Sequence, residues 1–161
     1  MIVVSDTSPI SNLIQIGRLD LLHEVFGEVL IPPMVQEEIL ELANFGIDLK
    51  AFLKSEWITT RSLRDPSKTT PLLADLDEGE SEAIALAKEV AADWILIDER
   101  AGTKIAEYLG LHPIGVVGML IKAKEKGLIS LVVPVVEELR ATAGFWISDK
   151  FLKKIQRDLG E

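Results

Sequence analysis

Two short apolar runs of this chain each end in an aspartate. Residues 2–5 read IVVS and are followed by Asp6, and residues 94–97 read WILI and are followed by Asp98. Apolar runs of this length are typical of strands that are buried on both faces of a sheet. A carboxylate is costly inside such a core, so we expect each strand to end where the chain leaves the core. If both strands belong to one parallel sheet, the two acids enter a shared crevice beyond its carboxyl edge.

Further short apolar segments alternate along the chain with segments of helical spacing. Strands are predicted at residues 2–5, 28–32, 57–62, 94–97 and 113–116. Helices are predicted from an N-cap at Ser8 to just before Gly17, at residues 19–26, 33–43, 47–53, 78–90, 101–109 and 132–142, in a segment that ends near Gly127, and after an N-cap at Ser148. Residues 63–71 are polar enough to form a loop. This alternation predicts an α/β fold with a central, mostly parallel sheet covered by helices on both faces.

The size and composition of the chain indicate one folded domain spanning residues 1–161. A length of 161 residues suits a single core, and 48% hydrophobic with 27% charged residues is ordinary for a folded protein. The absence of cysteine excludes disulfides, thiolate metal sites and cysteine nucleophiles. No stretch is long and uncharged enough for a membrane helix, and no signal peptide is apparent, so we expect a cytoplasmic protein without a membrane association. No P-loop, G-x-S-x-G or G-x-G-x-x-G motif is present.

The net charge of −9 constrains any interaction with nucleic acid. Proteins that hold nucleic acid through their overall field are usually basic. Attraction would therefore have to come from bound cations or from local basic patches. Two candidate patches are Arg100 with Lys104, and a stripe near the end of the chain made of Lys150, Lys153, Lys154 and Arg157. Each patch could equally be a solvated helix face.

Four acidic segments are candidates for one site: Asp6, residues 37–38, residues 78–82 and residues 98–99. Two unit charges 4 Å apart repel by roughly 4 kcal/mol at an effective dielectric constant of 20, so a cluster of carboxylates needs compensation. A hard divalent cation supplies it, and an oxygen-only site favours Mg²⁺ or Mn²⁺. Zinc is disfavoured because the chain has no cysteine and only two histidines. Magnesium retains water ligands, which suits hydrolysis of a phosphodiester.

A structural role explains each acid taken alone. Asp6 and Asp98 could be N-caps of the helices that follow them. The acids at residues 37–38 could form a solvated face, and those at the start of residues 78–90 could complement the helix dipole. Glu82 is harder to explain in this way because it borders the apolar arc predicted for its helix.

The order of several motifs resembles the PIN-domain family, most closely stand-alone prokaryotic PIN proteins similar to VapC-type toxin ribonucleases. The motifs are VVSDTSPISNLIQIGRLDLL, VLIPPMVQEEI, LDEGESEAIALA, WILIDERAGTKIAEYLGL and AGFWIS. They follow one another in the expected order and span nearly the whole chain.

The resemblance implies a Mg²⁺- or Mn²⁺-dependent endoribonuclease with a three-layer α/β/α fold, commonly a homodimer. Toxin members of the family are neutralised by a cognate antitoxin. The positions that match the family's catalytic and metal-binding acids are Asp6, Glu38, Glu82 and Asp98, with Ser8, Glu78 and Glu99 as secondary candidates. Many relatives carry aspartate at the third position, where glutamate has a longer reach. The fourth position could be Asp98 or Glu99, of which Asp98 is preferred.

The expected function is therefore hydrolysis of RNA phosphodiester bonds by a bound metal, with a role as the toxin of a toxin–antitoxin pair. One alternative is a catalytically degenerate PIN-like domain that binds RNA or a protein. Another is a phosphatase-like or flap-nuclease activity at the same metal centre.

Overall fold

The computed structural model describes residues 1–161 and contains one five-stranded parallel sheet. The strands are β1 (Val3–Ser5), β2 (Val29–Ile31), β3 (Ile58–Thr60), β4 (Trp94–Leu96) and β5 (Pro113–Ile114). They lie in the order β3-β2-β1-β4-β5, and every neighbouring pair is parallel. Each predicted strand is present and is shorter than its predicted range.

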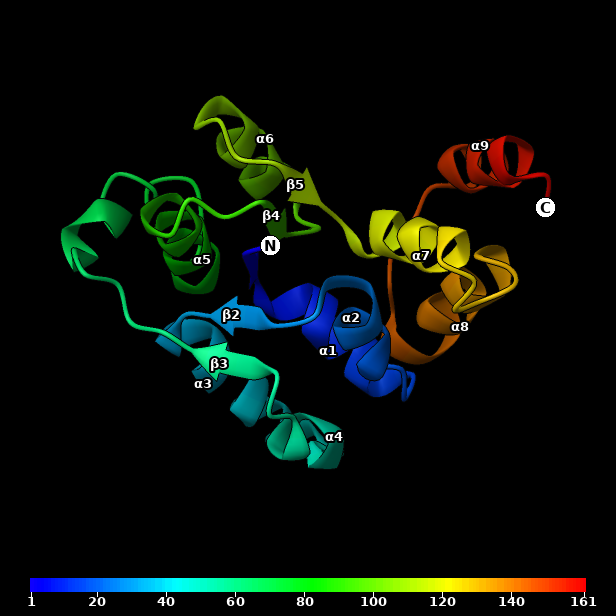
Figure 1. The fold of residues 1–161 in the computed structure, drawn as a ribbon, viewed down its shortest axis with the longest axis horizontal. Coiled ribbons are helices and arrows are strands. Elements are labelled where there is room, and N and C mark those ends of the chain that lie inside the picture. The colour runs from blue at the N-terminus through cyan, green and yellow to red at the C-terminus, as the bar shows by residue number, and fades with distance from the viewer.

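Nine α-helices surround this sheet. They are α1 (Thr7–Gln15), α2 (Asp20–Phe26), α3 (Pro33–Glu41), α4 (Lys50–Lys54), α5 (Glu78–Glu89), α6 (Arg100–Tyr108), α7 (Val116–Glu125), α8 (Val133–Ala143) and α9 (Asp149–Leu159), together with the 3₁₀ turns η1 (Leu42–Phe45) and η2 (Pro66–Thr69). Helices α5 and α6 lie on one side of the sheet, and α2 and α7 lie on the other (Figure 1). The predicted α/β fold, with helices on both faces, is confirmed.

Two local predictions differ from the structure. Helix α1 begins at Thr7, so the N-cap position belongs to Asp6 and not to Ser8. The segment predicted as a loop at residues 63–71 contains η2, where the Asp65 side chain accepts a hydrogen bond from the N–H of Ser67 at 3.1 Å.

The strand order creates a crevice at the carboxyl end of β1. The chain passes from β1 to β2 on one side and later crosses back to β4 on the other side of β1. The connections therefore diverge between β1 and β4, which is where ligand sites form in open parallel sheets. The N–H of Asp6 donates to the carbonyl of Leu96 at 2.9 Å, so the pairing of β1 with β4 holds Asp6 at this edge.

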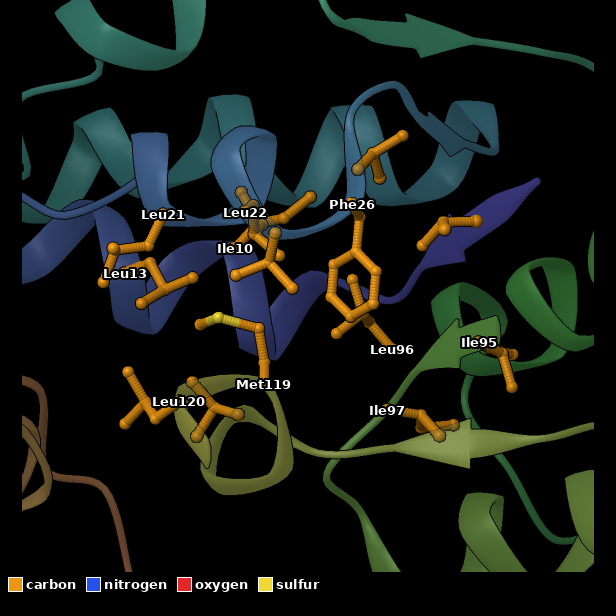
Figure 2. Packing of buried hydrophobic residues seen from close by; sticks show 14 of the residues in the cluster. Ile10, Leu13, Leu21, Leu22, Phe26, Ile95, Leu96, Ile97, Met119 and Leu120 are labelled. Atoms are coloured by element: carbon orange, nitrogen blue, oxygen red, sulfur yellow. The ribbon is translucent and has the colours of Figure 1, made fainter. Parts of the chain in front are cut away.

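A single apolar core holds the first helices against the sheet. Figure 2 shows Ile10 of α1, Phe26 of α2, Leu96 of β4 and Met119 of α7 gathered together, and all four are buried. Complete burial of a side chain of this size contributes about 1.5–3 kcal/mol. The core thereby fixes α1, and with it Asp6 at the start of that helix. None of the helices has the length and apolar character needed to cross a bilayer.

The Glu161 side chain ties α9 to its neighbours. Its carboxylate accepts hydrogen bonds from the N–H groups of Val132 and Val133 at 3.0 and 2.9 Å, where α8 begins. It also forms an ion pair with Lys124 of α7 at 2.7 Å. Helix α9 therefore lies in a fixed position beside α7 and α8 at one end of the molecule (Figure 1).

Candidate active site

Asp6 lies in the crevice and is 4% exposed. Although it occupies the N-cap position of α1, its side chain makes no capping hydrogen bond. Burial is the main reason that the pKa of Asp6 is raised to about 7. The nearby carboxylates of Glu80, Asp77 and Glu38 raise it further, and the Thr7 N–H offsets part of the shift. Glu38 and Glu80, which come from two of the other acidic segments, therefore lie near enough to Asp6 to raise its pKa.

Glu38 reaches the same region from α3. Its Oε1 atom is buried and has no hydrogen-bond partner. The side chain lies so close to Gly79 of α5 that a Cβ atom at that position would collide with it. Burial raises the pKa of Glu38, and the charge of Asp77 adds to the shift. The Thr7 hydroxyl offsets part of it, although Thr7 Oγ1 makes no hydrogen bond of good geometry.

Glu80 is the third buried acid and lies in the first turn of α5, 8% exposed. Burial raises its pKa to about 7, with further contributions from Asp77 and Glu99. Asp77 is the N-cap of α5 and accepts a hydrogen bond from the N–H of Glu80 at 2.8 Å. Asp6, Glu38 and Glu80 therefore repel one another from three separate elements.

The structure does not bring Glu82 into this group. Its Oε1 accepts a hydrogen bond from the N–H of Met34 at 3.3 Å, at the start of α3, where helix N–H groups lack partners within the helix. Glu82 lines a different hollow together with Pro33 and Ser62. The acid of this segment that is buried and that raises the pKa of Asp6 is Glu80.

Because Glu82 precedes the buried residues Ala85 and Leu86 by three and four residues, spacing alone does not single out Glu80. Glu80 precedes Ala83, Ile84 and Ala87 by three, four and seven residues, and all three of these residues are fully buried. Such spacing places Glu80 on their face of the helix. The interpretation of Glu80 as a first-turn charge ignored this face.

Asp98 follows β4 and is the second acid that the strand ends predicted. Its Oδ1 accepts a hydrogen bond from the N–H of Val116 at 3.0 Å, at the start of α7, whereas Oδ2 is buried without a partner. A Cβ atom at Gly115 would collide with Oδ1. Burial raises the pKa of Asp98 to about 6, and the Val116 N–H lowers it in part.

Glu99, not Asp98, caps the helix that follows. Its carboxylate accepts hydrogen bonds from the N–H groups of Ala101 and Gly102 at 2.8 and 3.2 Å. The Glu99 carboxylate thus caps α6, whereas the Oδ2 atom of Asp98 has no hydrogen-bond partner. This difference favours Asp98 over Glu99 as the fourth acid.

Asp98 and Ser8 border a groove with a volume of about 840 Å³. Its lining comprises Ser8, Ser11, Asn12, Gln15, Asp98, Glu99, Gly115, Val117, Gly118, Ile121, Ala143, Gly144, Phe145, Trp146, Ile147, Ser148 and Phe151. The remaining secondary candidate, Glu78, is exposed in the first turn of α5.

The donor atoms fit a hard cation held by few protein ligands. No three His, Cys, Asp or Glu side chains are arranged as a ready-made metal site. The buried side-chain atoms without hydrogen-bond partners are all oxygens: Thr7 Oγ1, Glu38 Oε1, Ser81 Oγ and Asp98 Oδ2. The ion pairs of the molecule involve none of these acids, so no lysine or arginine neutralises them. Magnesium is commonly bound through one or two carboxylates and completes its coordination with water.

Comparisons with known proteins agree with this fold. No curated protein shows significant sequence similarity to the chain. Among solved structures, it is similar to a PilT N-terminus domain protein from the hyperthermophilic archaeon Sulfolobus solfataricus P2, with a TM-score of 0.59 and 20% sequence identity, over 76% of this chain and 93% of that one. At this identity the likeness concerns the fold alone. A family model described as a PIN domain matches residues 2–161, and the chain therefore belongs to the PIN-domain family.

Proposed function

We propose that this protein is a metal-dependent nuclease that hydrolyses RNA phosphodiester bonds. One observation carries the proposal: Asp6, Glu38 and Glu80 converge from three elements without a basic partner, and each has a raised pKa. Carboxylates held in this way are stabilised when a cation binds between them. Family membership supports the same reading, because PIN domains commonly include nucleases.

Asp6, Glu38, Glu80 and Asp98 would hold Mg²⁺ or Mn²⁺, one or two of them directly and the others through water ligands of the ion. Glu80 replaces Glu82 in this set because the Glu82 carboxylate is engaged with Met34. When bound, such an ion lowers the pKa of a water molecule and offsets negative charge that develops on the phosphate.

The side chains of the site have further roles in this proposal. Without metal, Asp6 and Glu80 have pKa values of about 7, so binding of a cation near neutral pH would displace protons from them. Asp98 is anchored through one oxygen to Val116, which leaves Oδ2 for the metal. Ser8 lines the groove beside Asp98 and is placed to orient a phosphate or a water molecule.

The direct test is cleavage of a panel of RNA, single-stranded DNA and phosphomonoesters with Mg²⁺, with Mn²⁺ and with EDTA. We expect metal-dependent RNA cleavage that falls at least about 100-fold in Asp6→Asn and Glu80→Gln, since loss of a positioned catalytic group costs about 10²–10⁴-fold. Glu82→Gln is the matched control on the same helix and should retain activity within about threefold.

Several outcomes would contradict parts of the proposal. Binding of RNA without any metal-dependent cleavage would favour a degenerate binding module. Cleavage of phosphomonoesters or DNA in preference to RNA would change the substrate class. Loss of activity in Glu82→Gln with full activity in Glu80→Gln would return the third position to Glu82.

The biological context follows as a separate part of the proposal. We propose a toxin role with a cognate antitoxin and a homodimeric state, both supported only by the likeness to VapC-type proteins. A small reading frame beside the gene whose product forms a complex with this protein and blocks cleavage would support the first, and light scattering of the purified protein measures the second.

A further inference from the structure

Two aromatic side chains stand out from the core at the outer part of the groove. Trp146 is 81% exposed and Phe151 is 46% exposed, and both line the groove that contains Asp98. Their neighbours Ile147 and Leu152 are buried, at 6% and 7%. The buried neighbours anchor this segment to the core, so the rings of Trp146 and Phe151 remain exposed on the surface of the molecule.

One face of α1 forms a polar wall of the same groove. It carries Ser8, Ser11, Asn12 and Gln15, whose spacing of three and four residues places them in one row. These neutral groups both donate and accept hydrogen bonds. The wall runs beside Asp98, so the groove joins the aromatic side chains to the candidate active site.

Helix α9, which contributes Phe151 to the groove, also has a basic surface. Lys150, Lys153 and Arg157 line a shallow hollow of about 370 Å³ together with Gln156, and no acid contributes to it. The two acids of the helix are paired elsewhere, Asp149 with Arg140 at 3.4 Å and Asp158 with Lys154 at 3.9 Å.

The three basic side chains of this hollow therefore form no ion pair with an acid of the protein. They form a local reversal of sign on a chain whose net charge is −9. Such a patch is what an acidic protein needs in order to hold a polyanion.

We propose that this groove binds single-stranded RNA, with bases stacked on Trp146 and Phe151 and backbone phosphates held by Lys150, Lys153 and Arg157. Unpaired bases offer faces for stacking on aromatic rings, whereas the bases of a duplex do not. The strand then passes along the polar wall of α1 toward Asp98. That the RNA strand runs toward Asp98 rests on the proposed function, but RNA binding to the groove can be measured without cleavage.

The aromatic part is tested by fluorescence anisotropy with a labelled single-stranded RNA of about 10 nucleotides, a length within the usual range for such sites. EDTA is present throughout so that no metal-dependent cleavage occurs. Trp146→Ala should weaken binding at least about fivefold, the lower end of what stacking of one base contributes. Trp146→Phe should retain most of the affinity, and Tyr108→Ala, which removes a 90% exposed ring from α6, should leave it unchanged.

The basic part is tested through the salt dependence of the same binding. Lys153→Ala and Arg157→Ala should each lower the slope of log affinity against log salt by about 0.7, the value for one phosphate contact on a single strand. Lys50→Ala is the matched control, because Lys50 is exposed on α4, well apart from α9 (Figure 1). All of these side chains are exposed, so circular dichroism and melting temperature should match those of the unsubstituted protein.

The outcomes of these binding and cleavage experiments decide whether the groove binds single-stranded RNA. The inference would be overturned if Trp146→Ala left the RNA affinity unchanged or if both α9 variants left the salt slope unchanged. Tighter binding of duplex than of single-stranded RNA, or binding of a protein partner in place of RNA, would also overturn it. RNA binding that depends on Trp146 without any cleavage in Mg²⁺ or Mn²⁺ would support this inference and contradict the proposed function. Metal-dependent RNA cleavage that is unaffected by substitution of Trp146, Lys153 or Arg157 would support the proposed function and contradict this inference.

Discussion

At the scale of single residues, glycine makes room for two of the four candidate acids. Gly79 lies against the Glu38 carboxylate and Gly115 lies against that of Asp98, and a Cβ atom at either position would collide with the acid. Neither glycine has a positive φ. Close approach, not backbone conformation, is therefore the reason that glycine is needed there.

Replacing Gly79 tests this relation. Gly79→Ala should lower the free energy of unfolding by about 1–3 kcal/mol through overpacking, although alanine favours helix by about 1 kcal/mol. It should also weaken Mn²⁺ binding, because Glu38 must move. Urea unfolding and metal titration of the purified variant measure the two effects.

The matched background for this variant is Glu38→Ala, which removes the group that the new methyl would meet. In that background Gly79→Ala should cost nothing or stabilise the protein, so that the double-mutant cycle shows strong coupling. Additive effects would mean that the glycine serves some other purpose.

Three of the four candidate acids, Asp6, Glu38 and Asp98, are also candidates from the sequence, whereas Glu80 is added by the structure. Asp6 and Asp98 follow apolar strands, and Glu38 was assigned by family resemblance. Family resemblance matches the third position to Glu82, and its place at the border of one predicted apolar arc agrees with that match. The helix instead packs against β1, β4, α3 and α6, so it is buried on most of its surface, and only its neighbours decide which acid is enclosed.

At the scale of elements, local signals predicted helices well. Ser148 is the N-cap of α9, and its Oγ accepts a hydrogen bond from the N–H of Phe151 at 3.1 Å. Ile147 and Leu152, which flank this N-cap in the sequence, are both buried. Capping depends on a few adjacent residues, and for this reason the sequence is informative about it.

The segment before α5 shows what local signals omit. The Glu89 carboxylate at the end of α5 accepts hydrogen bonds from the N–H groups of Arg64 and Asp65, both at 2.9 Å. This contact joins residues 24 and 25 positions apart. A polar loop with such an anchor looks unstructured in the sequence because its partner lies far along the chain.

The Glu161 tie between α7, α8 and α9 gives a prediction at this scale. Glu161→Ala leaves two N–H groups at the start of α8 and the Lys124 ammonium without their partner. We expect a loss of about 1–2 kcal/mol in the free energy of unfolding, typical for loss of a helix N-terminal acceptor. Thermal unfolding followed by circular dichroism measures it.

The control for that variant is Glu125→Ala, which removes an exposed carboxylate from α7. Its effect should stay within about 0.5 kcal/mol, as for most surface substitutions. Equal melting temperatures for the two variants would show that the Glu161 contacts are not stabilising in solution.

At the scale of the whole molecule, the buried acids make stability depend on pH. The pKa values of Asp6 and Glu80 are raised to about 7 and that of Asp98 to about 6. Between the ordinary carboxyl pKa near 4 and these values, the native state binds more protons than the unfolded state. The free energy of unfolding therefore falls as pH rises through this window.

Without divalent metal, we expect the Asp6 carboxyl alone to lower the free energy of unfolding by roughly 2–3 kcal/mol between pH 5 and 7.5, at about 1.4 kcal/mol for each pH unit below its raised pKa, and Glu80 and Asp98 to add to this fall. Mg²⁺ or Mn²⁺ should restore stability at pH 7.5 and have little effect at pH 5. Urea unfolding at both pH values measures this, and the double variant Asp6→Asn, Glu80→Gln should flatten the dependence. Stability that rises over the same range would contradict the buried-acid cluster.

The edge strand β5 also limits how copies of the molecule can associate. The carbonyls of His112 and Ile114 accept hydrogen bonds from Ile95 and Ile97, so the backbone nitrogen of Pro113 lies on the free edge of β5. Proline has no N–H to offer there. Recruitment of a foreign strand to lengthen the sheet is blocked at this edge, and self-association there would have to proceed through side-chain surfaces.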